Sequence, residues 1–185
     1  VMASKTTDVE ALKAVEVEGE TVEAILTDCI HVMGENTELS RVAYLEAPAV
    51  ASYIHGAGKI GVLVEFDVGG IDASSEEFKQ CGKDVAMQVA AIAPIACNRE
   101  DVDPAVVEHE MGIYKAQAAE SGKPEAIQEK IATGRLEKFF KEQCLTEQAF
   151  VKDSDKTVTE YVNSVAKALG GTIKVKSFTR FALGE

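Results

Sequence analysis

The sequence predicts an α+β fold: an antiparallel sheet with helices packed on it, plus an inserted antiparallel helical hairpin (a short coiled coil). Two apolar runs, Val50–Ile54 and Ile60–Phe66, flank a glycine-rich turn, which is typical of a β-hairpin. The last stretch, Thr172–Leu183, alternates apolar and polar residues as a strand does. Between them, two helical patterns are joined only by Ser121–Pro124, as in a helical hairpin.

The first 33 residues carry helix signals. Asp8 can cap a helix over Val9–Val15, and Thr21 can cap a second helix that ends at Gly34. The opening Val1–Ala3 is typical of the last turn of an upstream helix, so we expect the chain to be a fragment of a longer protein.

The stretch Leu39–Ala47 is apolar and partly alternating, and it predicts a strand that leads into the hairpin. After the hairpin we expect a loop over Asp67–Ala73. Ser74 and Glu77 have the S-x-x-E spacing of a capping box, which predicts a helix over Ser75–Ile92.

The helical hairpin begins at Asp103-Pro104, a cap followed by proline at the first helical position. Four residues at spacings of four, three and four form a coiled-coil-like seam: Val107, Met111, Tyr114 and Ala118. The second helix, Glu125–Cys144, has a less regular apolar stripe around Gly134. This arm can pack on a core, project into solvent or pair with a copy of itself.

The rest of the chain is expected to return to the sheet. Leu145–Lys152 is predicted to be extended, and Asp155 to cap a helix over Lys156–Leu169. The alternation of the last strand breaks near Ser177, which predicts an irregularity there.

Composition limits the classes of function. With 31 acidic and 19 basic residues the net charge is −12, which disfavours nucleic-acid binding. No apolar run approaches the about 20 residues of a membrane span, and the N-terminal stretch lacks the apolar core of a secretory signal. We therefore expect a cytoplasmic protein that binds neither nucleic acid nor membrane.

The glycine turn also matches a nucleotide-binding pattern, Gly56-x-Gly58-x-x-Gly61. That pattern binds phosphate only where a helix follows, and here the strand-like Val62–Phe66 follows instead. We therefore predict no nucleotide cofactor. His55 next to the turn either bonds nearby backbone or contacts a partner.

No catalytic constellation is visible. The four cysteines form no C-x-x-C pair, no histidine stands at zinc-ligand spacing from them, and there is no phosphate-binding P-loop. We expect no catalytic residue, no metal and no cofactor, and therefore a binding protein rather than an enzyme.

Several segments resemble the elongation factor Ts family, the exchange factors of elongation factor Tu. They are SYIHGAGKIGVLVEF at 52–66, GKDVAMQVAAIAP at 82–94, EKIATGRLEKFFKE at 129–142 and FTRFALG at 178–184. The resemblance implies that 1–38 is the helical end of a first core subdomain. It implies a second core subdomain at 39–97 and 145–185, with the helical hairpin at 98–144 inserted.

The resemblance implies a translation factor that binds elongation factor Tu with GDP and promotes GDP release. The family's Thr-Asp-Phe-Val-Ala motif is absent, because Thr7-Asp8 continues with Val9 and Thr27-Asp28 with Cys29. We therefore expect binding with impaired exchange. The alternative is a homodimerising interaction module without exchange activity.

Carried over residue by residue, the resemblance implies five contacts with elongation factor Tu: His55, Lys83, Asp84, Val151 and Lys152. Many relatives have histidine at the position of Asp84. The inserted hairpin often mediates dimerisation in the family, which would place Val107, Met111 and Tyr114 in a homodimer interface.

Overall fold

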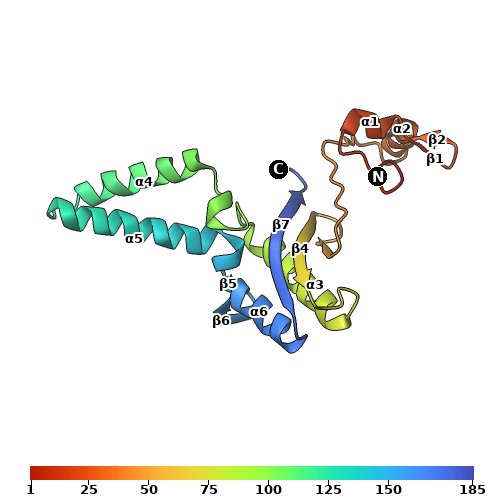
Figure 1. Cartoon of the computed structure of the whole chain (residues 1–185). Coiled ribbons are helices and arrows are strands. Elements are labelled where there is room, and N and C mark those ends of the chain that lie inside the picture. The colour runs from red at the N-terminus through yellow and green to blue at the C-terminus, as the bar shows by residue number, and fades with distance from the viewer. The chain divides into compact units, whose positions relative to one another are not determined.

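The computed structural model describes residues 1–185, which form two compact units, Val1–Glu46 and Ala47–Glu185 (Figure 1). Each unit is described by itself. None of the helices is both long and apolar enough to cross a lipid bilayer.

The first unit contains two capped helices and a small hairpin: α1 (Val9–Lys13), β1 (Glu16–Val17), β2 (Glu20–Thr21) and α2 (Val22–Met33). Both predicted N-caps are confirmed: Asp8 Oδ1 accepts from the Ala11 amide at 2.6 Å, and Thr21 Oγ1 from the Ala24 amide at 3.2 Å. Gly34 ends α2 with φ 69°, a left-handed conformation that suits glycine. The two-residue strands were not predicted, because runs this short carry no periodicity.

The predicted strand over Leu39–Ala47 is wrong, since residues 34–49 form neither helix nor strand. A strand needs a neighbour to satisfy its backbone, and strand β3, which follows, pairs only with β4. Side chains organise the segment instead. The Tyr44 hydroxyl donates to Glu46 Oε2 at 2.9 Å, and Lys5 Nζ forms an ion pair with the same oxygen at 2.5 Å.

The second unit is built on an antiparallel sheet of three strands, β3 (Val50–His55), β4 (Ile60–Gly69) and β7 (Thr172–Ala182), in the order β3-β4-β7. The predicted hairpin and the return of the last strand to it are both confirmed. Strand β4 continues past Phe66, because β7 pairs with it as far as Gly69 opposite Thr172. Asp67–Gly69 are therefore strand rather than the predicted loop.

A β-bulge lies where the alternation of the last strand breaks. Glu65 pairs with Ser177 and Phe66 with Val175, which leaves Lys176 as the extra residue. The predicted irregularity near Ser177 is confirmed. The bulge shifts the phase of the strand, so that Val175 before it and Phe178 after it both pack against the main core.

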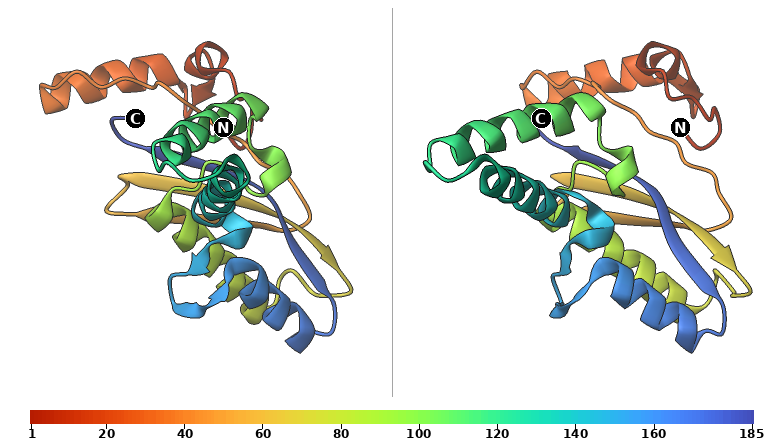
Figure 2. Two further views of the ribbon diagram at one scale, coloured as in Figure 1. Left: turned by 90° about the vertical axis from the view of Figure 1, so that its left-hand side faces the viewer. Right: turned by 60° about the vertical axis from the view of Figure 1, so that its left-hand side comes forward.

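Two helices, α3 (Glu76–Ile92) and α6 (Val158–Ala168), cover one face of this sheet (Figure 2). The core between them includes Val64, Phe66, Val85, Val89 and Val158, all almost fully buried.

The N-caps of these two helices differ from the predicted ones. Ser75, not Ser74, caps α3 by accepting from the Phe78 amide at 3.3 Å, while the Ser74 hydroxyl donates to Asp72 Oδ1 at 2.7 Å. A capping box needs Glu or Gln at the third helical position. With Ser75 as the cap, that position is Phe78, so the predicted capping box does not form. Thr157 caps α6 in a capping box with Glu160, and the predicted cap Asp155 lies in a strand.

Helices α4 (Pro104–Ala119) and α5 (Glu125–Gln143) form the predicted antiparallel hairpin, an arm that projects from the sheet region (Figure 1). Asp103 caps α4 as predicted, accepting from the Ala105 amide at 2.8 Å. The connections at the arm's root are η1 (Arg99–Asp101) and η2 (Leu145–Glu147), followed by β5 (Ala149–Phe150) and β6 (Asp153–Thr157). The predicted extended segment therefore begins with a 3-10 turn.

Candidate functional site

The structure brings three of the five predicted contact residues together. Asp84 lies on α3, and Val151 and Lys152 form the turn between β5 and β6; Lys152 Nζ reaches Asp84 Oδ1 at 2.6 Å. Lys83 is exposed on α3 beside this group and makes no hydrogen bond or ion pair. His55 lies at the end of β3, where its ring contacts Tyr53.

The Asp84 carboxylate is buried, with 5% of the residue exposed. Oδ1 accepts from Gln80 Nε2 at 2.7 Å and from Lys152 Nζ at 2.6 Å, and Oδ2 accepts from the Tyr161 hydroxyl at 2.8 Å. Three donors offset the cost of burying this charge. Asp84 therefore serves contacts inside the chain and exposes almost no surface of its own, and the contact with a partner that the resemblance implies for it stays a prediction.

The surroundings of Asp84 disfavour further negative charge. Burial, followed by the hydrogen bond to Asp84, raises the pKa of Tyr161. Cys81 lies one turn before Asp84 on α3. Burial raises its pKa to about 12, and the Asp84 carboxylate contributes to this rise. Both groups stay protonated at neutral pH, so Cys81 is not a thiolate nucleophile.

Gln88, one helical turn beyond Asp84, is fully buried and was not singled out from the sequence. Its Nε2 donates to Gln148 Oε1 and to the Ala149 carbonyl, both at 3.1 Å, and its Oε1 accepts from the Val151 amide at 2.8 Å. The only sequence signal is a polar residue between apolar Val85 and Val89 on a helix. A side chain there must find polar partners within the protein.

The turn between β5 and β6 has one side chain inside and two outside. Phe150 is 2% exposed and stacks on the Tyr161 ring at 4.1 Å between centroids and 13° between planes. Val151 is 43% exposed, and the Lys152 side chain is 44% exposed. The turn therefore presents an apolar and a basic side chain on a backbone that is fixed from within.

His55 bonds a neighbouring side chain rather than nearby backbone, and its contact with a partner stays a prediction. Its Nδ1 is hydrogen-bonded to the Tyr53 hydroxyl at 2.9 Å, and its side chain is exposed beside the exposed Ile54. The turn that follows has positive φ at Gly56, Ala57 and Gly58. Strand β4, not a helix, begins after it, as predicted from the residues beyond Gly61.

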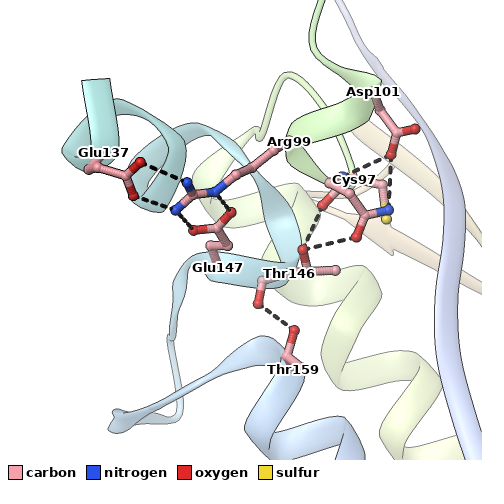
Figure 3. A network of polar contacts seen from close by, with 8 residues as sticks. Cys97, Arg99, Asp101, Glu137, Thr146, Glu147 and Thr159 are labelled. Carbon is pink, nitrogen blue, oxygen red and sulfur yellow. Dashed lines mark hydrogen bonds and ion pairs between the residues drawn. The ribbon is translucent and has the colours of Figure 1, made fainter. Parts of the chain in front are cut away.

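An ion-pair network holds the root of the arm (Figure 3). Arg99 lies between two carboxylates: Nη1 and Nη2 donate to the two oxygens of Glu137 at 2.9 and 2.8 Å, and Nε and Nη2 donate to Glu147. The Arg99 guanidinium also lies 4.9 Å from the centre of the Phe140 ring. These hydrogen bonds raise the pKa of Arg99 and lower that of Glu137.

The threonines beside this network join η2 to its neighbours (Figure 3). Thr146 Oγ1 contacts the Cys97 carbonyl at 3.0 Å and Asn98 Oδ1 at 3.1 Å, and the Thr159 hydroxyl donates to the Thr146 carbonyl at 2.6 Å. A second apolar cluster lies at the root of the arm. It consists of Ala96, Val102, Phe140 and Cys144, with Val107, Leu136 and Phe139 packed against it. The arm is thus anchored by charge and by apolar packing.

The predicted seam lies inside the arm. Val107, Met111 and Tyr114 are half-buried and Ala118 is buried, while Arg135 of α5 donates to Gln117 of α4. A second copy would therefore meet little of these side chains, because the arm already covers part of their surface. Pairing of two copies through the seam stays a prediction.

No group of three or more histidine, cysteine, aspartate or glutamate side chains is arranged to hold a metal ion. The exposed side chains of His55, Lys83 and Val151 all belong to the second unit.

Comparison with known proteins agrees with this description. The family described as Elongation factor TS matches residues 1–185. The Elongation factor Ts proteins of Trichlorobacter lovleyi and Clostridium kluyveri are 46% and 43% identical over the whole chain. That of a Clostridium botulinum strain is 42% identical over 99% of it. The chain spans 61% of the length of the first two relatives. A match of this extent and identity shows that the chain belongs to the elongation factor Ts family.

Proposed function

We propose that this chain binds elongation factor Tu as part of a guanine-nucleotide exchange factor of translation. The observation that carries the proposal is the family match over residues 1–185. The contact surface includes Val151 and Lys83, which are both exposed, and His55 at the tip of the sheet. Buried Asp84 contributes to this surface from within the chain by pairing with the half-exposed Lys152.

An exchange factor acts by binding the nucleotide-free GTPase more tightly than the nucleotide-bound form. Such a mechanism needs a preformed surface and no covalent chemistry. Because no Thr-Asp-Phe-Val-Ala motif occurs in these 185 residues, we propose binding without efficient GDP release.

A second candidate function is pairing with another copy through the arm. It is favoured by the outer face of α4, where the exposed Ile113 lies beside the small residues Ala105, Gly112 and Ala116 in a shallow hollow. Small side chains allow close approach of another helix. This pairing is compatible with binding to elongation factor Tu.

The first proposal is tested by titrating the chain onto elongation factor Tu of Trichlorobacter lovleyi, with GDP and without nucleotide. We expect binding in both states, tighter without nucleotide. Val151→Asp should weaken it at least about tenfold, because a charge would replace an apolar contact at the interface. Val17→Asp, at a valine of similar exposure (46%) in the first unit, is the matched control.

The exchange part of the proposal is tested by the release of a fluorescent GDP analogue. The chain should leave the release rate close to that of elongation factor Tu alone. Binding in neither nucleotide state would overturn the proposed partner. Release as fast as with the complete Trichlorobacter lovleyi factor would overturn the proposed loss of exchange.

A further inference from the structure

We propose that Asp84 and Gln88 are positioning residues that hold the 149–153 turn, so that Val151 is presented in a fixed place to elongation factor Tu. Lys152 takes part as the partner of Asp84 and not as a free cation for the GTPase. This inference rests on the proposed binding to elongation factor Tu and names how this site of the chain is built.

The two residues lie on the same side of α3 because positions four apart on a helix are neighbours. Gln88 bonds the backbone of the turn on both sides of Phe150, through the Ala149 carbonyl and the Val151 amide. Asp84 bonds Lys152 at the end of the turn. Together they fix both ends of a short segment to one helix.

These contacts hold four successive residues of the turn, Ala149 to Lys152. Ala149 is bonded through its carbonyl, Phe150 through its ring on Tyr161, Val151 through its amide and Lys152 through its ammonium group. The only large side chain that is exposed without a contact of this kind is that of Val151, because the exposed side chain of Ala149 is a single methyl group. The turn therefore offers a partner one ordered apolar side chain, and ordering before binding lowers the entropic cost of association.

The positive charge of Lys152 is already paired with the Asp84 carboxylate inside the chain. Asp84 is buried, and of its three donors only Lys152 carries a positive charge. If a carboxylate of the partner drew Lys152 away, the buried Asp84 would keep only the neutral donors Gln80 and Tyr161. Leaving a buried charge without its counter-ion is strongly unfavourable. The ion pair therefore persists in the complex.

The experiment compares Asp84→Asn, Lys152→Met, their double variant and Gln88→Ala in the complete chain. Affinity for nucleotide-free elongation factor Tu is measured by titration. Hydrogen exchange of the Val151 amide is measured in the free chain, where no partner is needed. Lys79→Met is the matched control, because Lys79 also lies on α3 but pairs with the exposed Glu76 at 2.7 Å.

Gln88→Ala should speed exchange of the Val151 amide at least about tenfold and weaken binding, although Val151 itself is unchanged. Asp84→Asn and Lys152→Met should each weaken binding several-fold, and the double variant should be no weaker than either single one. Such non-additivity is the signature of residues that act through each other. The control should leave both measurements unchanged.

Two results would overturn the inference. Lys152→Met could weaken binding equally with and without Asp84→Asn, which would make Lys152 a direct contact. Alternatively, Gln88→Ala could leave exchange of the Val151 amide unchanged, so that the turn is not held by α3. If the unmodified chain does not bind elongation factor Tu, the proposed function fails, and the exchange measurement alone decides whether the turn is held.

Discussion

Gly82 of α3 lies directly against Ala51 of β3, where a Cβ built on the glycine would be 2.7 Å from the Cβ of the alanine. No residue with a side chain fits at position 82, where helix α3 approaches the edge strand β3 this closely. We predict that Gly82→Ala lowers the free energy of unfolding by about 1 to 2 kcal/mol, because overpacking outweighs the gain in helix propensity. Urea unfolding, monitored by circular dichroism, measures this change in the free energy of unfolding.

Gly134 in the middle of α5 provides the matched control. A Cβ there would meet nothing within 4 Å, so Gly134→Ala should raise the free energy of unfolding by about 0.5 to 1 kcal/mol. Equal stability of Gly82→Ala and the unmodified chain would contradict the close packing of α3 on β3.

The elements that were predicted correctly have local causes. The β-hairpin follows from two apolar runs about a glycine turn, and the bulge at Lys176 from a break in alternation. The caps of α3 and α6 were missed by one or two residues, because adjacent residues such as Ser74 and Ser75 suit the position equally. The strand predicted over Leu39–Ala47 failed because a strand needs a neighbour, which alternation does not supply.

The candidate site was predictable only in part. The resemblance picked out Asp84, Val151 and Lys152, which the structure brings together. The roles of Gln88 and Arg99 were invisible, because their partners lie about 40 to 60 residues away in sequence. Which buried polar groups meet is decided by the packing of α3, α5 and η2. A pattern of spacings along the chain does not contain that information.

Arg99 should be necessary for the stability of the arm's root. Arg99→Ala removes hydrogen bonds to Glu137 and Glu147 and leaves two carboxylates facing each other. We expect the free energy of unfolding to fall by about 1 to 2 kcal/mol, since hydrogen bonds to charged groups are among the stronger ones. Limited proteolysis should cut at the root of the arm sooner than in the unmodified chain.

The matched control for Arg99 is Lys138→Ala. Lys138 forms an exposed ion pair with Glu142 at 3.5 Å, and pairs of this kind contribute less than about 1 kcal/mol. If Arg99→Ala were no more destabilising than Lys138→Ala, the network would not anchor the arm.

The four cysteines should differ sharply in reactivity. Cys29 is exposed, whereas Cys81, Cys97 and Cys144 are buried. Burial raises the pKa of Cys81 and Cys97 to about 12 and that of Cys144 to about 11. Iodoacetamide reacts with the thiolate, so mass spectrometry should find Cys29 alkylated first in the native protein. In denaturant all four should react alike.

The burial of these three thiols also predicts that the protein loses stability at alkaline pH. A thiol whose pKa is raised on folding contributes stability that is complete below its usual pKa of 9.0 and lost as the pH rises toward 11 to 12. Each buried thiol should cost on the order of 1 kcal/mol per pH unit in that window. Cys81→Ala should therefore flatten the fall of the melting temperature above pH 9, and Cys29→Ala should not. Parallel curves for all three proteins would contradict this origin.

The last prediction concerns self-association through the arm. The seam that the sequence indicated, with Met111 and Tyr114, is half-buried within the arm, so the exposed outer face of α4 is the surface left for a second copy. Ile113, 36% exposed, is its main apolar side chain. Ile113→Lys should lower the mass found by sedimentation to that of one chain, with the melting temperature nearly unchanged. Met111→Lys should lower the melting temperature, because it places a charge between α4 and α5. A monomeric mass for the unmodified chain at all concentrations would refute pairing through the arm.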